Sequence, residues 1–197
     1  VLMRGLFNYI VSPVGDRYNN KVQVEEGKDL IINTEISNHE YVNRVAEVVQ
    51  VPIGIATPIR RGQEVLVHHQ VFRRWYDVKG RERNSRAWAN EDKYLVEQDQ
   101  VFLYRNAGEE WNPMPGYCFV QPIENDDRFS LDAEKPLVGV VRYSGIPLMV
   151  GKLVGFSPND EFEFIVDGVR LYRVMDKYIN IEYEYQGDEK AYNPSWA

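Results

Sequence analysis

Short runs of apolar and β-branched residues, separated by turns that contain glycine and proline, recur along the whole chain. They occupy residues 6–11, 45–51, 62–67, 94–105, 118–122, 137–141, 153–156, 162–166 and 179–185. The last two place apolar residues at every second position, as a half-buried strand does. No stretch keeps the 3.6-residue period of an amphipathic helix over several turns. The pattern predicts an all-β protein with short strands in a barrel or a sandwich.

Four of these segments occur in the same order in both halves of the chain. The aligned pairs are 9–13 with 118–122, 45–49 with 137–141, 62–65 with 151–154, and 98–102 with 175–179. The offsets are 109, 92, 89 and 77 residues. Ordered matches with falling offsets predict a tandem repeat. The second copy would be shorter by 17 residues after its first strand and by 12 after its third.

The repeat also predicts the domain organisation. A first barrel would span residues 4–107, followed by a linker at 108–116, a second barrel at 117–187 and a tail at 188–197. The first copy would carry a long polar loop at 15–43 and an insertion at 72–90. A loop of that length with few elements of its own is uncommon in a compact domain, unless it is functional or mobile.

Composition narrows the class of protein. The 197 residues include 23 Lys and Arg against 30 Asp and Glu, which gives a net charge of −7 and argues against a general nucleic-acid binder. No apolar run approaches the roughly 20 residues that span a bilayer. Neither a signal peptide nor a basic targeting segment opens the chain. We expect a soluble cytoplasmic protein without a membrane partner.

Residues that could carry catalysis or bind a metal are few. The single cysteine, Cys118, excludes an intramolecular disulfide and lies in an apolar strand pattern, which favours a buried structural thiol. His68 and His69 are adjacent in a predicted strand, so their side chains would point to opposite faces and could not share an ion. No phosphate-binding loop or nucleophile elbow occurs. We assign no catalytic residue, metal or cofactor, and we do not expect an enzyme.

The order of the segments resembles the GroES-type co-chaperonin family over most of both halves. That family has an opening strand, a mobile loop with a hydrophobic tripeptide, a Gly-Glu-Val-Leu-Ala-Val strand, a Val-Gly-Asp-x-Val-x-Phe turn and strand, and a closing Asp-Ile-Leu-Ala-Ile strand. The matching segments are 9–11, 30–32, 45–49, 62–67 and 99–104 in the first half, and 150–156 and 176–181 in the second. The resemblance implies two tandem GroES-like small β-barrels.

The chain also departs from the family pattern. Lys28-Asp29 replaces the usual Gly-Gly before the tripeptide, and the second half has no apolar tripeptide loop. The roof hairpin is nearly absent in both halves, which is similar to the co-chaperonins of T4-like bacteriophages. The resemblance therefore implies a bacteriophage-encoded protein in the host cytoplasm.

The resemblance implies a mechanism as well. Leu30, Ile31 and Ile32 stand where the family tripeptide lies, and would bind an apolar groove of a chaperonin ring. A homo-oligomer, joined through exposed edge strands, would link many weak loops into one cap. The residues themselves leave an alternative open. The same island could be a strand packed against its own barrel.

The insertion at 72–90 concentrates arginine and aromatic residues in an acidic chain. We interpret it as a possible interface arm formed by Arg73, Arg74, Trp75, Tyr76, Arg81, Arg83, Arg86 and Trp88. Trp, Tyr and Arg are the residue types that anchor protein interfaces. The arm suggests the alternative function of a bacteriophage virion protein, a capsid decoration or head–neck component that holds capsid subunits. A solvated loop is the other interpretation, and nucleic-acid binding is not expected.

Overall fold

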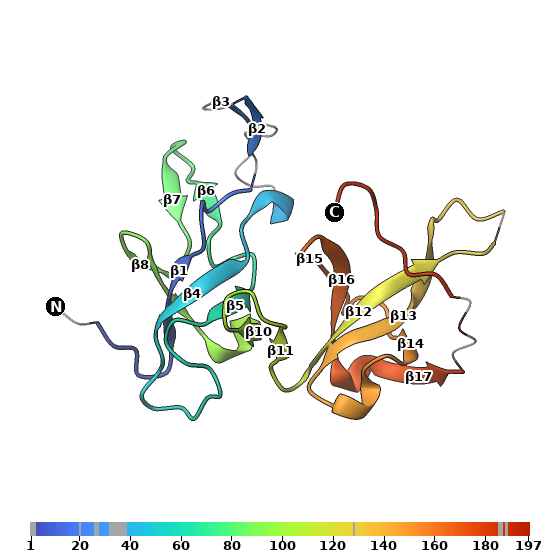
Figure 1. Cartoon of the computed structure of the whole chain (residues 1–197). Coiled ribbons are helices and arrows are strands. Elements are labelled where there is room, and N and C mark those ends of the chain that lie inside the picture. The colour runs from blue at the N-terminus through green and yellow to red at the C-terminus, as the bar shows by residue number, and fades with distance from the viewer. Residues whose placement is uncertain are drawn as a thin grey trace. The chain divides into compact units, whose positions relative to one another are not determined.

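The computed structural model describes residues 3–19, 21–25, 28–31, 39–127, 129–184, 187 and 189–197. The chain forms two compact units, Val1–Trp111 and Asn112–Ala197, which meet within the predicted linker (Figure 1). Both units consist of antiparallel strands and short 3₁₀ turns, and the described residues contain no α-helix. The predicted all-β class is confirmed.

The first unit contains most of the strands of one seven-stranded sheet. Its strands are β1 (Tyr9–Pro13), β2 (Lys21–Glu25), β3 (Lys28–Ile31), β4 (Val45–Gln50), β5 (Glu64–Val67), β6 (Arg74–Tyr76), β7 (Glu82–Asn84), β8 (Trp88–Asn90), β9 (Lys93–Val96) and β10 (Val101–Arg105). The 3₁₀ turns are η1 (His39–Tyr41) and η2 (Gln98–Gln100), and β11 (Asn112–Pro113) follows the unit boundary. The strand order is β11-β10-β5-β4-β1-β9-β8, and β2–β3 and β6–β7 are separate two-stranded hairpins.

The second unit is built on one six-stranded sheet. Its strands are β12 (Tyr117–Glu124), β13 (Glu134–Ser144), β14 (Leu153–Phe156), β15 (Phe162–Val166), β16 (Val169–Met175) and β17 (Ile179–Tyr183), with the 3₁₀ turns η3 (Pro147–Met149) and η4 (Asp176–Tyr178). The strand order is β15-β16-β12-β13-β14-β17. Residues of the predicted tail are hydrogen-bonded to this unit: Lys190 O accepts from Glu124 N, and Tyr192 N donates to Pro122 O.

The two sheets have the same strand order. Reading β10-β5-β4-β1-β9-β8 in the first unit beside β17-β14-β13-β12-β16-β15 in the second matches every strand in chain order and in position. A register shift also recurs at the same place, between Ile10 and Val11 in β1 and between Phe119 and Val120 in β12. The two units therefore have one topology in common.

The pairing corrects two of the sequence offsets by one residue. Val48 exchanges hydrogen bonds with the Gly62–Gln63 turn as Val141 does with Gly151–Lys152, so the second offset is 93 (141 − 48) rather than 92. Val101 pairs with Val67 as Ile179 pairs with Phe156, so the last offset is 78 (179 − 101) rather than 77. A one-residue slip places every side chain on the opposite face of the sheet, and runs of valine do not reveal it.

The predicted closed barrels are not seen. Among the described strands, each sheet ends in two different edge strands, so hydrogen bonding leaves it open. A barrel would require the first and last strands of a sheet to pair with each other. The predicted small barrels are thus replaced by two open antiparallel sheets.

Each unit has its own apolar core. In the first unit, Phe72 and Tyr94 are completely buried and their rings meet edge to face with centroids 4.8 Å apart. In the second unit, the central cluster consists of buried side chains from β12, β13, β14 and β16: Cys118, Val120, Val141, Val154, Phe156 and Val174. Burying a large apolar side chain contributes about 1.5–3 kcal/mol, so these residues account for much of the stability of each sheet.

A proline stands at the same rung of both sheets. Pro13 in β1 faces Ala46, and Pro122 in β12 faces Gly139. A Cβ atom added to Gly139 would lie 2.3 Å from the carbonyl oxygen of Gln121, so this position admits only glycine without a shift of the backbone. Proline has no N–H to donate, which weakens the ladder at the point where each strand leads into its long connection.

Candidate partner-binding site

The segment predicted to bind a partner lies on the β2–β3 hairpin. Leu30 pairs with Val22 and Ile31 pairs with Lys21, while Ile32 lies outside the described residues. Among the described strands, β2 and β3 pair only with each other, and Figure 1 shows them projecting beyond β1 and β4. The backbone of Leu30 and Ile31 therefore pairs with β2, and among the described strands it is not part of the seven-stranded sheet.

The base of this hairpin is tied by one buried asparagine. Asn43 Nδ2 donates to the carbonyl oxygens of Val14 and Asp16 at 2.8 and 2.9 Å, and its Oδ1 accepts from Val45 N at 2.9 Å. Its backbone N–H donates to Arg17 O at 2.9 Å. An asparagine that is 3% exposed thus uses both side-chain groups to join the two ends of the long loop.

The second insertion supports that base. Arg17 donates from Nε and Nη2 to Phe72 O at 3.1 and 2.8 Å, and from Nη1 to Asn84 Oδ1 at 2.8 Å. Tyr18 Oη accepts from Arg74 N at 2.7 Å, and the Arg74 guanidinium lies 4.8 Å from the centre of the Tyr18 ring. Burial lowers the pKa of Arg17. The loop at 15–43 and the insertion at 72–90 are therefore one connected structure.

Two arginines of the predicted interface arm form ion pairs within the β6–β7 hairpin. Arg74 pairs with Glu82 at 2.9 Å, and Arg83 pairs with Asp77 at 2.9 Å. The pKa of Asp77 is lowered, chiefly because Arg81 N–H donates to its carboxylate. These contacts make the hairpin self-supporting, and they pair two of its four positive charges locally.

The aromatic residues of the arm are exposed but anchored. Trp75 donates from Nε1 to Asn84 O at 3.1 Å, and Trp88 donates from Nε1 to Glu91 O at 2.9 Å. Their exposed fractions are 48% and 41%, and that of Tyr76 is 58%. Rings held by their polar edge while their faces meet solvent are suited to contact with another molecule.

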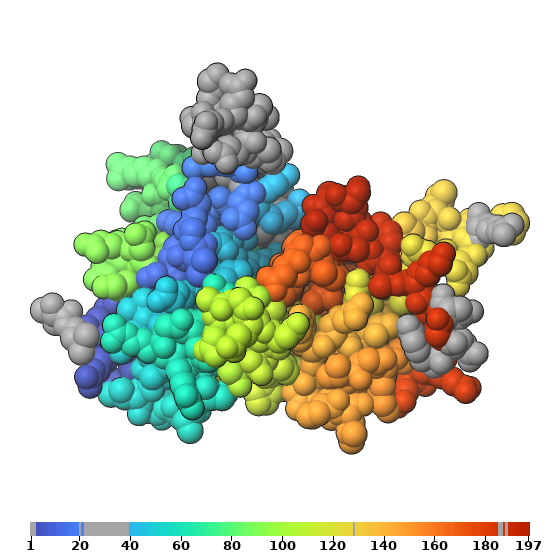
Figure 2. All heavy atoms as spheres, in the orientation of Figure 1, coloured from blue at the N-terminus to red at the C-terminus, as the bar shows by residue number. Residues whose placement is uncertain are grey.

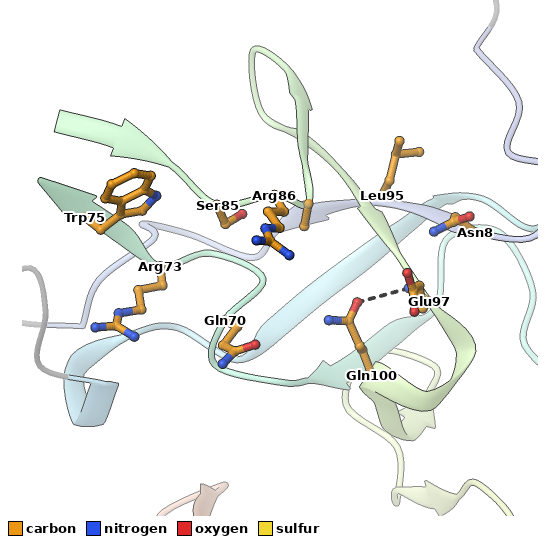
Figure 3. A pocket seen from close by; sticks show the side chains of 10 residues that line it. Asn8, Gln70, Arg73, Trp75, Ser85, Arg86, Leu95, Glu97 and Gln100 are labelled. Carbon is orange, nitrogen blue, oxygen red and sulfur yellow. Dashed lines mark hydrogen bonds between the residues drawn. The ribbon is translucent and has the colours of Figure 1, made fainter. Parts of the chain in front are cut away.

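Two arginines of the arm line an open hollow of about 700 Å³ in the first unit (Figure 3). Arg73 and Arg86 share its wall with Trp75, Gln70 and Glu97. Within the described part of the chain, no hydrogen bond or ion pair joins Arg73 or Arg86 to another residue, and Arg73 Nε is buried without an acceptor. The hollow therefore presents two cations and one carboxylate beside an exposed indole ring.

The second unit exposes two apolar residues that the sequence analysis passed over. Phe129 and Leu131 lie on the β12–β13 connection and are 97% and 103% exposed. That connection corresponds to the one between β1 and β4, which contains the β2–β3 hairpin. Their position between two aligned strands can be read from the sequence. They do not form a contiguous apolar tripeptide like residues 30–32, because Ser130 lies between them.

The lone cysteine is a buried structural thiol, as the sequence predicted. Cys118 is fully buried, and its Sγ lies 2.9 Å from Asp176 Oδ1 and 3.1 Å from Ser144 Oγ. Burial and the neighbouring Asp176 raise the pKa of the thiol to about 12. A thiol with so little thiolate at neutral pH is a poor nucleophile.

The prediction for the two adjacent histidines was wrong. Strand β5 ends at Val67, so His68 and His69 lie in the following turn, and their ring centroids are 4.2 Å apart. His68 Nδ1 accepts from Gln70 N at 3.2 Å. In the described residues, no group of three or more His, Cys, Asp or Glu is placed to hold a metal ion. Nor does that part of the chain include a helix long and apolar enough to cross a membrane.

No protein-family model matches the chain, and no curated protein matches it.

Proposed function

We propose that this protein is a GroES-like co-chaperonin, built from two tandem GroES-like units, that caps a chaperonin ring through the apolar residues of its β2–β3 hairpin. Leu30, Ile31 and Ile32 would enter an apolar groove of the ring. The observation that carries the proposal is the placement of that hairpin. It lies in the connection between β1 and β4, pairs with neither of these strands, and rises from a base fixed by Asn43.

The strand arrangement supports the proposal. The segments that resemble the family are β1, β4, β5 and β10, which are consecutive neighbours in one sheet. The corresponding strands β12, β13, β14 and β17 are neighbours in the other. The segments that resemble the family in their order along the chain thus also lie side by side in one sheet of each unit. Two copies of one folding unit would have this arrangement.

The physical mechanism is reversible capping by many weak contacts. Burying an apolar side chain of this size is worth about 1.5–3 kcal/mol, from which the ordering of the loop must be subtracted. A single loop therefore binds weakly, and a ring of chains binds tightly because the loops are linked. Copies could join at sheet edges, since β17 exposes 50% of Ile181 and 41% of Tyr183.

The test is capture of the protein by a bacterial chaperonin ring in the presence of ATP, together with the change in the ring's ATPase rate. Ile31→Asp should weaken binding by about 10- to 100-fold, because a charge cannot enter an apolar groove. Val78→Asp is the matched control, since Val78 is 104% exposed at the tip of the other hairpin. Binding that is absent in the wild type, or equal in all three proteins, would refute the proposal.

One observation favours a second candidate, a bacteriophage virion protein that decorates or joins capsid subunits. The hollow of Figure 3 holds Arg73 and Arg86 beside the exposed ring of Trp75, an arrangement that fits an acidic segment of a neighbouring subunit. Co-sedimentation with assembled capsids, lost in the double variant Arg73→Glu and Arg86→Glu, would support this function. A protein that binds the chaperonin and ignores capsids would exclude it.

A further inference from the structure

The β12–β13 connection of the second unit presents two large apolar side chains to solvent. Phe129 and Leu131 are almost fully exposed, and within the described residues only Val78 is a large hydrophobic residue of equal exposure. The connection, yellow in Figures 1 and 2, protrudes from the body of its unit. Single exposed apolar residues are ordinary, but two on one loop tip form a contact point without a partner in the unit.

The backbone of this loop is held by its own hydrogen bonds. Asn125 N donates to Ala133 O at 3.1 Å, which closes the base of the loop. Phe129 N donates to Asp127 Oδ1 at 2.9 Å, and Asp132 N donates to Ser130 Oγ at 3.1 Å. Side-chain acceptors thus satisfy the backbone on both sides of Leu131. A preordered loop loses little conformational entropy when its tip is bound.

Both ends of the loop are anchored to the unit. At its start, Glu124 N donates to Lys190 O at 2.8 Å. At its end, the carboxylate of Glu134 accepts from Arg170 and from the hydroxyl of Tyr172. The first unit anchors the ends of its own loop in a comparable way, through Arg17 and Asn43. Each unit therefore fixes the base of the same connection.

Charge is also similar in the two connections. Residues 124–134 include five acidic residues and one basic residue, and residues 15–43 include six acidic and three basic residues. An apolar tip flanked by carboxylates is complementary to an apolar groove with a basic rim. Both connections, which lie at one topological position, thus contain large apolar residues and an excess of carboxylates.

We propose that the β12–β13 connection is a second partner-binding loop, in which Phe129 and Leu131 enter an apolar groove with a basic rim on the same chaperonin ring. This inference rests on the proposed function and extends it, because each chain then binds the ring through two anchors. A chain with two linked anchors dissociates more slowly than one with a single anchor. The second loop, being already ordered, contributes mainly apolar contact.

The experiment measures binding of the full-length protein to an immobilised chaperonin ring with ATP. The double variant Phe129→Ser and Leu131→Ser should weaken binding by about 10- to 100-fold, and adding Ile31→Asp should weaken it further. Val78→Ser is the matched control and should bind as the wild type does. Because all three positions are fully exposed, thermal unfolding should not change.

The outcomes separate this inference from the proposed function. If Ile31→Asp loses binding while the double variant binds like the wild type, the second loop is refuted and the co-chaperonin function stands. Equal losses in the double variant and in Val78→Ser would also refute it, since any exposed apolar residue would then suffice. A wild type that does not bind the ring overturns both proposals.

Discussion

The two units have the same sheet and differ in what lies between its strands. The first unit adds the β2–β3 hairpin between β1 and β4, and the β6–β7 hairpin between β5 and β8. The second unit has a short loop at the first place and a direct connection at the other. The six-stranded order is unaffected by either addition. The sheet is therefore the common framework, and the connections carry whatever distinguishes the copies.

The two additions of the first unit also depend on each other. Arg17, at the base of the first hairpin, donates to Phe72 O and Asn84 Oδ1 at the two ends of the second. The second unit lacks both additions and anchors its loop through Arg170 and the strand-like residues at 190–192. The comparison shows that the longer connection of the first unit occurs together with an inserted hairpin that supports its base.

The largest expected effect concerns the two arginines that fix the base of each loop, Arg170 in the second unit and Arg17 in the first. Arg170 is 12% exposed and pairs with Glu134 and with Glu163. Burial acts to lower the pKa of Arg170, but these carboxylates outweigh it and raise the pKa above its ordinary value. Arg170→Met leaves two carboxylates without their cation, so we expect the second unit to lose about 3 kcal/mol of unfolding free energy. Urea unfolding followed by labelling of Cys118 reports on that unit alone.

The matched change in the first unit is Arg17→Met. Its hydrogen bonds go to neutral oxygens, so the loss should be smaller, about 1–2 kcal/mol. Tryptophan fluorescence follows this unit, because Trp75, Trp88 and Trp111 lie in it and only Trp196 in the other. Equal losses of unfolding free energy in the two variants would contradict this distinction between an arginine paired with carboxylates and one bonded to neutral oxygens.

An effect of similar size is expected where Pro13 faces Ala46 and Pro122 faces Gly139. Gly139→Ala forces a Cβ against Gln121 O and should destabilise the second unit by about 2 kcal/mol. The matched change, Ala46→Gly, opens space and adds backbone freedom, and should cost the first unit about 1 kcal/mol. Gly139→Ala should shift only the urea midpoint reported by labelling of Cys118. Ala46→Gly should shift only the midpoint reported by tryptophan fluorescence. A Gly139→Ala protein as stable as the wild type would show that the rung can relax.

The last effect is absent at neutral pH and concerns the lone thiol. The pKa of Cys118 is raised from 9.0 to about 12, so the unfolded chain ionises first as the pH rises. The thiol's contribution to stability is therefore complete below pH 9 and is lost between pH 9 and 12, by at most about 1.4 kcal/mol per pH unit. Unfolding of the wild type and of Cys118→Ser across this range measures the difference. Parallel curves for the two proteins would exclude the effect.

The sequence located most of the strands of the two sheets because they have a local signal, but it missed β16 and joined β9 and β10 into one segment. Runs of valine and isoleucine between glycine turns located β1, β4, β5 and β10 and their counterparts. The register was less certain, and two offsets were wrong by one residue. Neighbouring valines, such as Val48 and Val49, match a valine strand equally well on either face, and only the pairing partner distinguishes them.

The supporting contacts could not be read from the sequence. Arg17 and Phe72 are 55 residues apart, and no pattern in either segment points to the other. The interface-arm interpretation treated every arginine at 72–90 as available, whereas Arg74 and Arg83 are paired within the hairpin. Phe129 and Leu131 have no such signal, because Ser130 separates them and they do not form an apolar run.

The paired prolines at 13 and 122 mark where the framework common to the two units ends. Each stands on the last shared rungs before the connections diverge in length, so an insertion made beyond them leaves the sheet below undisturbed. Doubling the length of a loop adds only about 0.6 kcal/mol to the cost of closing it. These rungs thus act as grafting points, at which a connection of another length can be joined while the framework stays fixed.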